Sequence, residues 1–378
     1  MTKTPEEWLI NAIFNGHINY LEYDKFTDPT VIGTGGFGTV FKYEWKDCEL
    51  TIALKCLKVD TSLDEKIIKD FINELKLLRR VGYHPNIITF YGVTKDYQGN
   101  YNMILQYAND GNLREYLKTN FKRLKWTDKL YFAKNIALGL LFLHENKIVH
   151  RDLHSKNILI HEKQPKIADF GLSKQINEMS MTSNSIIHGM PAYVEPQCLV
   201  KKGYKRDERS DIYSFGVILW EISSGRPPFQ TFESKMELCF HIFQGNREER
   251  IEGTPLKYVD LYEQCWNKEP ANRPETKSIL NTLNQLISND DSNQPENLIQ
   301  SENSNPSENS NQSENLNQSE TLNQFENFSS SQYINTHANS LEITTSSPLP
   351  DMIEPDSRET KTNPNPLSQG KDILMDNR

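Results

Sequence analysis

Long apolar runs are absent from this chain of 378 residues, and so is an excess of positive charge. No window approaches the roughly 20 consecutive apolar residues of a membrane-spanning helix, so we expect no membrane insertion. The formal net charge of −9 gives no support to a nucleic-acid partner or to adhesion to a membrane surface. The stretch from Met1 to Trp8 is too acidic for a signal peptide. We therefore expect a cytoplasmic protein, and a nuclear location stays open.

Cysteine is equally scarce, and the chain has no Cys-x-x-Cys pair. Scattered cysteines of this kind do not support a disulfide framework or a zinc site, and they fit reduced, mostly buried thiols. The five residues are Cys48, Cys56, Cys198, Cys239 and Cys265.

Apolar periodicity is confined to about the first three quarters of the chain, after which six hexapeptide copies follow from Asn293 onward without a glycine. One apolar residue in six cannot offset the entropy of ordering the chain. A β-helix also repeats every six residues, but it needs stacked apolar rungs and turn glycines. We predict that residues 289–378 form a disordered tail, whose Asn and Gln content favours self-association.

Residues 148–159 set one Asp and one Asn five positions apart between apolar pairs that predict short buried strands. An Asp-Phe-Gly triplet beginning at Asp169 follows another strand-like segment. Asp152, Asn157 and Asp169 are thus offered from two adjacent loops. Oxygen ligands of this kind suit Mg²⁺, which is usually held by one or two carboxylates together with substrate phosphates. A carboxylate left free of metal could accept a proton from a hydroxyl.

Residues 150–157 read His-Arg-Asp-Leu-His-Ser-Lys-Asn, and the Asp-Phe-Gly triplet follows at a short distance. Either triplet alone is usually an ordinary loop. The whole pattern resembles the catalytic core of a eukaryotic protein kinase over about residues 26–288, and it is most similar to the tyrosine-kinase-like group. The resemblance implies that Asp152 is the catalytic base and that Asn157 and Asp169 hold Mg²⁺.

A Gly-x-Gly-x-x-Gly pattern at Gly33, Gly35 and Gly38 could by itself announce a dinucleotide-binding fold. That fold needs a helix after the glycines, but the β-branched and aromatic residues that follow predict a second strand. A glycine turn between strands resembles the kinase lid, whose backbone approaches the ATP phosphates without a Cβ in the way. The resemblance implies an ATP site formed by Ile32, Gly33, Gly35, Gly36, Phe37, Gly38, Val40, Ala53, Lys55, Leu105, Gln106, Ala108 and Leu159.

Lys55 and Glu74 are charged residues in apolar settings. Lys55 ends the phrase Ile-Ala-Leu-Lys and shares a sheet face with Ala53 by strand alternation. Glu74 falls in the apolar stripe of a helix that we expect to open with the capping box Ser62–Glu65 and to end near Arg80. A solvated strand lysine is the plain alternative. The resemblance implies instead that Glu74 orients Lys55 onto the α- and β-phosphates of ATP.

The resemblance also assigns the link between the two lobes. Leu105 would guard the back of the nucleotide pocket, and the backbone from Gln106 to Ala108 would offer hydrogen bonds to adenine. A stacked apolar column of the active state would consist of His150, Phe170, Leu78 and Phe90.

The predicted fold is α+β and two-lobed, with a small antiparallel β lobe that carries one helix and a larger, mainly helical lobe. We expect helices at about residues 5–20, 127–146 and 210–222, and closing helices that end near residue 287. Asp211 resembles the family residue that holds the catalytic loop, which is compatible with a first-turn carboxylate favoured by the helix dipole. The expected domains are a helical extension at 1–25, a kinase domain at 26–288 and the tail at 289–378.

The chain departs from the family pattern at two positions. Met190 stands where the family has Thr. Gln197 stands where the family has a Glu that pairs with an Arg, here Arg273. A neutral Gln leaves that charge uncompensated, which costs on the order of 1–3 kcal/mol for a half-buried group. Glu195 is an alternative partner.

The segment between Asp169 and Gln197 resembles an activation segment. A phosphate added there by an upstream activator or by the protein itself could pair with Arg151 and order the segment. The candidate acceptors are Ser180, Thr182, Ser183 and Ser185.

Two features point in opposite directions about the substrate hydroxyl. His154 stands where serine/threonine kinases usually carry Lys, and Lys156 follows at a position that is basic in many tyrosine kinases. Residues 189–193 instead resemble the serine/threonine platform, and platform geometry decides how deep the hydroxyl must reach. We expect transfer of the γ-phosphoryl group of Mg-ATP to Ser or Thr of protein substrates in signalling, with Tyr kept open. A pseudokinase that binds nucleotide and partners without turnover is the rival class.

Overall fold

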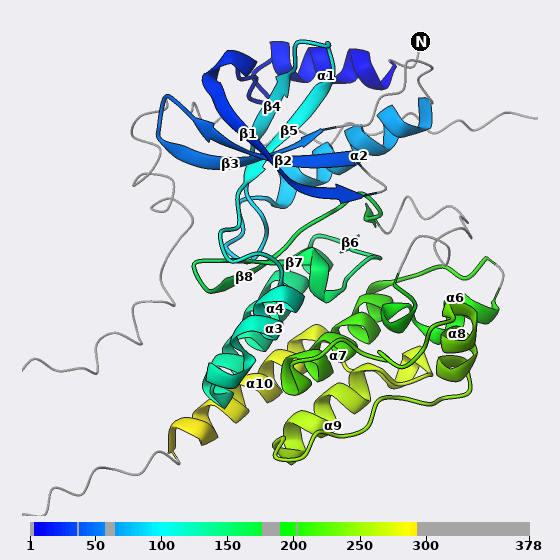
Figure 1. Cartoon of the computed structure of the whole chain (residues 1–378). Coiled ribbons are helices and arrows are strands. Elements are labelled where there is room, and N and C mark those ends of the chain that lie inside the picture. Colours follow the sequence, from blue (N-terminus) through cyan, green and yellow to red (C-terminus); the bar gives the residue numbers. More distant parts are fainter. Residues whose placement is uncertain (1–3, 36–37, 57–64, 176–189, 202, 293–378) are drawn as a thin grey trace, which may run out of the picture. The chain divides into compact units, whose positions relative to one another are not determined.

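The computed structural model of the protein describes residues 4–35, 38–56, 65–175, 190–201 and 203–292. Its small lobe is a five-stranded sheet in the order β1-β2-β3-β5-β4, with every neighbouring pair antiparallel. Figure 1 shows this sheet with one long helix, α2 (Glu65–Val81), beside it. The strands are β1 (Phe26–Gly35), β2 (Gly38–Trp45), β3 (Leu50–Cys56), β4 (Phe90–Lys95) and β5 (Tyr101–Gln106).

Apolar residues cover both faces of this sheet. On one side, Phe71, Leu75 and Leu78 of α2 join Met103 of β5 in the main buried cluster. On the other side, a separate cluster is rich in aromatic rings that meet edge to face. That cluster consists of Phe26, Tyr43, Trp45, Ile52, Leu54 and Ile104.

A short helix, α1 (Pro5–Phe14), precedes the sheet. Thr4 and Glu7 form a capping box at its start, since each side chain accepts a hydrogen bond from the other residue's backbone N–H. The helix ends at Phe14 with Asn15 as its C-cap, because Gly16 adopts a left-handed conformation with φ +67°. The expected helix at residues 5–20 is therefore shorter than predicted, although Gly16 lies at its end as expected.

The large lobe is mainly helical, and α7 lies at its centre with almost every side chain buried. Trp220, Tyr213 and Phe215 of α7 are among the largest fully buried residues, and the helix expected at residues 210–222 is confirmed. Its helices are α3 (Leu113–Asn120), α4 (Trp126–Glu145), α6 (Pro196–Val200), α7 (Glu208–Ser224), α8 (Lys235–Phe243), α9 (Leu256–Cys265) and α10 (Thr276–Ser292).

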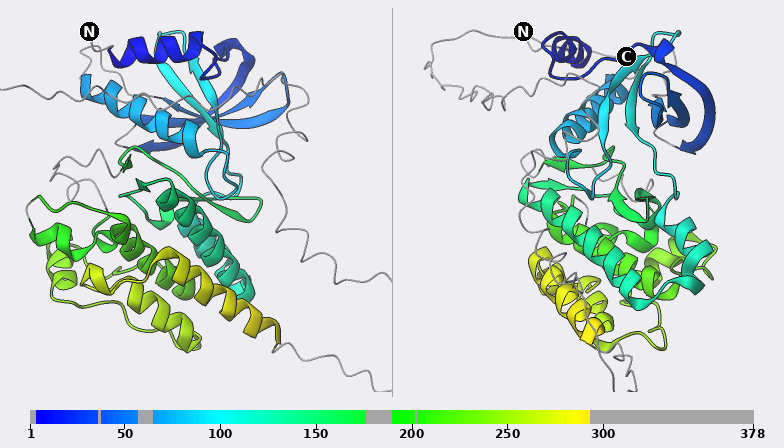
Figure 2. Two further views of the ribbon diagram at one scale, coloured as in Figure 1. Left: turned by 180° about the vertical axis from the view of Figure 1, so that it is seen from behind. Right: turned by 90° about the vertical axis from the view of Figure 1, so that its left-hand side faces the viewer.

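Short strands and 3₁₀ turns complete the two lobes and the loops between them. The strands are β6 (Ile148–Val149), β7 (Ile158–His161), β8 (Gln164–Ile167) and β9 (Lys174–Gln175), with β6 paired to β9 and β7 to β8. The 3₁₀ turns are η1 (Tyr23–Lys25), η2 (Phe121–Arg123), η3 (Ser155–Asn157), η5 (Pro191–Tyr193) and η6 (Pro270–Asn272). Figure 2 shows from behind how β7 and β8 lie below the sheet and above α4.

The α+β two-lobed fold is confirmed. One boundary differs: α10 continues to Ser292, beyond the expected domain end at residue 288, because a helix anchored by Leu283 and Leu286 can extend into polar residues. Residues 62–64 of the predicted capping box and the predicted tail after Ser292 lie outside the described residues. All five cysteines are free thiols. None of the helices in the described part of the chain has both the length and the apolarity that crossing a membrane requires.

Candidate active site

The catalytic-loop residues lie between β6 and β7, where the backbone leaves a buried strand and turns through η3. The Asn157 side-chain amide donates to the Asp152 carbonyl at 2.9 Å and lies 3.4 Å from its carboxylate Oδ2. This contact fixes the orientation of Asn157, so that its side-chain oxygen points away from Asp152. The two residues predicted from their five-residue spacing therefore meet at one site.

Asp211, in the first turn of α7, holds the backbone of this loop. Its carboxylate accepts hydrogen bonds from the N–H groups of His150 and Arg151, both at 2.8 Å, and His144 lies 3.2 Å away. Burial opposes ionisation of Asp211, but these hydrogen bonds and the nearby histidines outweigh it, so its pKa lies below the usual value. Arg151 adopts φ +70°, a strained conformation for a non-glycine residue, which these bonds maintain. The geometry predicted for Asp211 is present.

Lys55 of β3 connects the two lobes through two carboxylates. Its Nζ lies 2.6 Å from Glu74 Oε1 on α2 and 3.1 Å from Asp169 Oδ1. Burial alone would lower the pKa of Lys55, but both carboxylates outweigh it and raise the pKa above its ordinary value. Burial likewise opposes ionisation of Asp169, and the Lys55 charge more than compensates, so the pKa of Asp169 is lowered. Lys55, Glu74 and Asp169 are thus brought together as predicted.

Of the predicted apolar column, His150 and Phe170 are in ring contact, and the other two residues belong to or pack against the same buried cluster as Phe170. Phe170 is buried, and its ring centroid lies 5.2 Å from that of His150. Leu78 of α2 belongs to the same buried cluster as Phe170, and Phe90 packs against that cluster. The column fixes Asp169 on the side of Lys55.

Asn157 and Asp169 suit a divalent cation that is shared with a substrate. The lysine contact uses Oδ1 of Asp169 and leaves Oδ2, while Asn157 retains its side-chain oxygen. Within the described ranges, no group of three or more His, Cys, Asp or Glu side chains could hold a metal ion by itself. Two oxygen ligands fit Mg²⁺, which keeps several waters and is usually bound together with substrate phosphates.

The predicted nucleotide residues line the β1–β2 hairpin and the neighbouring strands. Val40 pairs with Lys55 across β2 and β3, and Ala53 pairs with Leu105 across β3 and β5. At the hairpin, Gly35 pairs with Gly38, Gly33 lies two residues earlier on β1, and the exposed Ile32 precedes it. Leu159 forms an isolated bridge with Asn112. Gly36 and Phe37 lie outside the described residues.

In the link between the lobes, one backbone donor is already used within the protein. The Gln106 N–H already donates to the Thr89 carbonyl at 2.9 Å, and the two side chains contact each other at 3.2 Å. Gln106 therefore has only its carbonyl to offer a nucleotide base, because the turn before β4 folds back onto β5. Ala108 follows two residues later, and its carbonyl accepts from Gly111 N–H at 3.5 Å.

His154 lies beside the proposed catalytic base. Its Nδ1 accepts a hydrogen bond from the Asn157 N–H at 3.2 Å, so the proton of the neutral ring is on Nε2. That atom lies 3.8 Å from Asp152 Oδ2. Burial lowers the pKa of His154 to about 4. The position where serine/threonine kinases usually carry Lys is therefore uncharged here.

Arg273 pairs with Glu195 and not with Gln197. Its Nη1 lies 2.6 Å from Glu195 Oε2, both side chains are fully buried, and Arg273 also donates to the carbonyls of Asn267 and Arg209. Gln197 instead lies 3.5 Å from the Lys268 carbonyl. The concern that Gln197 leaves Arg273 uncompensated is wrong, because Glu195 precedes α6 and projects into the lobe.

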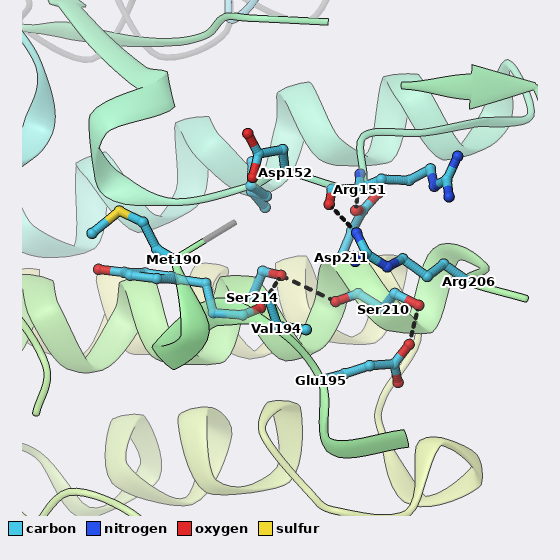
Figure 3. Close-up of a pocket in the computed structure, with 11 residues that line it drawn as sticks. Arg151, Asp152, Met190, Val194, Glu195, Arg206, Ser210, Asp211 and Ser214 are labelled. Carbon is cyan, nitrogen blue, oxygen red and sulfur yellow. Dashed lines mark hydrogen bonds between the residues drawn. The ribbon is translucent and has the colours of Figure 1, made fainter. Parts of the chain in front are cut away.

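Two further arginines were not predicted from the sequence. Arg114 of α3 contacts Ser155, Tyr193 and Glu221, from three distant parts of the chain. Arg206 donates to the Arg151 carbonyl, so two guanidinium groups lie at the same pocket (Figure 3). Neither arginine stands in a recognisable motif, and only the folded chain brings each to its partners.

Comparison with known proteins gives the family. The model described as protein tyrosine and serine/threonine kinase matches residues 27–283. A probable serine/threonine-protein kinase of Dictyostelium discoideum is 32% identical over 70% of this chain and 28% of its own length. Dual specificity protein kinase shkA of the same organism is 30% identical over 70% of this chain and 50% of its own length.

A tyrosine-protein kinase, Abl of Drosophila melanogaster, is 31% identical over 68% of this chain and 15% of its own length. The chain thus spans half or less of the length of these relatives. The matched region contains the two-lobed fold, the Lys55 bridge and the catalytic loop, and with them the chain belongs to the family of protein tyrosine and serine/threonine kinases.

Proposed function

We propose that the protein transfers the γ-phosphoryl group of Mg-ATP to hydroxyl groups of protein substrates. The observation that carries this proposal is the Lys55 ammonium held between Glu74 and Asp169, at 2.6 and 3.1 Å. A lysine held in this way by two elements is a rigid cation next to the oxygen ligands that a metal–nucleotide complex needs. The matching family and the kinase names of the relatives support the same reaction class.

Each residue has a distinct task in this reaction. Lys55 binds the α- and β-phosphates, and Glu74 keeps its ammonium in place. Asn157 and Asp169 hold Mg²⁺, which when bound neutralises charge on the phosphates. The β1–β2 hairpin covers the phosphates and excludes water.

Asp152 orients the substrate hydroxyl and accepts its proton. Burial raises the pKa of Asp152, which makes this carboxylate a better proton acceptor than an exposed one. His154 keeps its Nε2 proton directed toward Asp152 and carries no charge near neutral pH.

We assign Ser and Thr as the preferred acceptors, with Tyr kept open. Arg114 contacts Tyr193 of the platform and Ser155 of the catalytic loop, and the Met190 sulfur lies 4.0 Å from the same guanidinium group. Met190 brings no hydroxyl to Asp152, so a reduced rate or relaxed selectivity is expected. The relatives carry serine/threonine, dual-specificity and tyrosine names, so phosphoamino-acid analysis of a degenerate peptide library is the deciding measurement.

The proposal extends to the organisation of the chain. A helical extension at residues 1–25, a kinase domain at 26–288 with α10 reaching Ser292, and a disordered tail after it fit a cytoplasmic signalling enzyme. A nucleotide-binding scaffold without turnover is disfavoured, because the lysine, the proposed base and both proposed metal ligands are present together.

Phosphate on the activation segment, added by an upstream kinase or by the protein itself, is the proposed activating signal. Arg151 Nε and Arg206 Nη2 are buried at one pocket and have no hydrogen-bond partner among the described residues (Figure 3). Burial and the charge of Arg206 lower the pKa of Arg151. A phosphate would accept hydrogen bonds from both arginines and offset the repulsion between their two positive charges.

The candidate acceptors Ser180, Thr182, Ser183 and Ser185 lie outside the described residues. We expect Arg206→Met to reduce the ratio of rates between phosphorylated and unphosphorylated protein toward one. The matched control is Arg209→Met, an exposed arginine paired with Asp207. An equally large activation in the Arg206 variant, or an active enzyme without phosphate by mass spectrometry, would argue against this mode of control.

The test of the function is phosphate incorporation by purified protein with Mg-ATP. Lys55→Met and Asp152→Asn should each remove nearly all transfer, while the circular dichroism spectrum shows that each variant remains folded. Removal of Mg²⁺ by a chelator should have the same effect as either substitution. Undiminished incorporation in both variants would refute the enzyme assignment.

A further inference from the structure

The N-terminal segment of residues 4–21 is seated on the small lobe behind α2. Leu9 and Ala12 of α1 are only 1% and 5% exposed, and they belong to the same buried cluster as Ile72 and Leu75 of α2. The Trp8 ring lies 4.6 Å from the Lys76 ammonium, which adds a direct α1–α2 contact. Figure 2 shows α1 next to α2. The helix is therefore part of the lobe and not an appendage.

The face of α2 that α1 covers is the one opposite Glu74. At about 100° per residue, Ile72 and Lys76 lie about 160° and 200° around the helix from Glu74. Ile72 is nevertheless only 3% exposed. Its burial, together with the Trp8–Lys76 contact, shows that α2 is held from behind while Glu74 on the front reaches Lys55 at 2.6 Å.

A second attachment fixes the same segment to the sheet. Beyond α1, the Asn19 carbonyl accepts from Val93 N–H at 2.9 Å, and Leu21 N–H donates to the Val93 carbonyl at 3.0 Å. The Asn19 side chain also donates to the Tyr91 carbonyl at 3.1 Å. These bonds cover the edge strand β4.

Gly92 of β4 leaves the space in which Asn19 of the N-terminal segment lies against the strand. A Cβ at this glycine would lie 2.4 Å from the Asn19 carbonyl oxygen, so any other residue would displace the N-terminal segment. A glycine of the sheet, far from α1 in the sequence, therefore makes room for residues 4–21.

We propose that residues 4–21 are a built-in brace that holds α2 so that Glu74 meets Lys55, and that Leu9 is a positioning residue for phosphoryl transfer. The brace acts through Glu74, because α1 presses on α2 from behind and β4 fixes the segment that follows α1. This inference rests on the proposed function for its kinetic consequence. Its structural consequence, the ordering of α2, can be measured without any turnover.

The first experiment measures amide hydrogen exchange across residues 65–81 in the full chain. Leu9→Ala should speed exchange in α2, because it opens a cavity between α1 and α2. Leu9→Met should restore slow exchange, since it replaces leucine with a side chain of similar volume. Ile10→Ala is the matched control on the same helix, because Ile10 is 51% exposed. Unchanged exchange of α2 in Leu9→Ala would overturn the proposal.

The second experiment is a double-mutant cycle with Glu74→Gln, run below the melting transition of every variant. Leu9→Ala should lower kcat/KM for ATP by about tenfold, within the loss that a small misplacement far from the chemistry can cause. In the Glu74→Gln background, Leu9→Ala should leave kcat/KM for ATP almost unchanged, because the brace then has no ion pair to position. If Leu9→Ala lowered kcat/KM by the same factor in both backgrounds, its role would be generally structural and the brace would be refuted. Absence of turnover in the wild-type protein would refute the proposed function alone, and hydrogen exchange would still decide the brace.

Discussion

Buried charge at the proposed active site is compensated by several partners at once. Lys55 meets two carboxylates, and Arg273 meets Glu195 together with backbone carbonyls. Removing a charge from water costs several kcal/mol, which a single contact seldom offsets. Shared partners lower the cost and fix the direction of each side chain. The residues that would bind nucleotide are therefore pre-oriented by the same contacts that make their burial tolerable.

The pairing of Arg273 leads to a prediction that separates two neighbouring residues. Glu195→Gln leaves the buried Arg273 charge without its carboxylate, so we expect a loss of about 3–5 kcal/mol in the free energy of unfolding. Gln197→Glu adds a carboxylate where the arginine is already paired, so it should be neutral or destabilising. Urea unfolding of both variants measures the difference. Stabilisation by Gln197→Glu would instead mean that Arg273 has a second vacant contact.

Residues in local motifs could be predicted from the sequence, whereas residues joined over long distances could not. Asp152 and Asn157 are five positions apart, so one loop brings them together. Arg114 meets Glu221 across more than a hundred positions, and no spacing rule announces that contact. Glu195 was open as a partner of Arg273 because its direction depends on the turn before α6.

The first turn of helix α7 contains Asp211, whose carboxylate holds the backbone of the catalytic loop. Its pKa is lower in the folded state, so the ionised carboxylate stabilises the fold above about pH 4, the ordinary range of an Asp carboxyl. This contribution is lost as pH falls through the lowered folded pKa. We expect Asp211→Asn to cost about 1–3 kcal/mol at neutral pH, the range for a lost buried hydrogen bond to a charge.

The pH dependence provides the check on that assignment. Because the wild-type advantage requires the ionised carboxylate, the difference in unfolding free energy between wild type and Asp211→Asn should shrink as pH is lowered below about 4. Chemical unfolding at a series of pH values measures it. Glu208→Gln, a change at a partly exposed residue in the first turn of the same helix, serves as the control. A difference that does not change with pH would indicate that shape, and not charge, holds the loop.

The ends of helices lie close to glycine where a glycine follows the helix, and the end of α10 differs from the expected position. Gly225 ends α7 in a left-handed conformation, and Gly82 is the first residue after α2. Helix α10 has no such signal near residue 288 and extends to Ser292. Helices α4 and α7 were expected at about residues 127–146 and 210–222, and both bury many apolar residues.

At the scale of the whole molecule, the two lobes are joined by the turn that follows α2. Ile88 N–H donates to the Ile167 carbonyl at 3.0 Å, and Ile167 N–H donates to the Asn86 carbonyl at 2.8 Å. The Asn86 side chain donates to Asn135 of α4 at 3.0 Å. The end of α2 is thus tied to the large lobe, while α1 supports its outer face. Glu74 therefore lies on a helix that both lobes hold.

The boundary between the folded domain and the repeat tract yields the last prediction. Truncation after Ser292 removes the hexapeptide copies, whose single apolar residue in six cannot anchor them, so kcat and the melting temperature should stay close to the full chain. Truncation after Asn281 also removes Leu283 and Leu286, which are 0% and 8% exposed in the main cluster. Loss of two buried leucines should cost roughly 4 kcal/mol or more and lower the melting temperature sharply. Thermal unfolding and phosphate incorporation measure both effects on the two truncated proteins. A large fall in melting temperature and activity of the protein that ends at Ser292 would mean that the tail is structural.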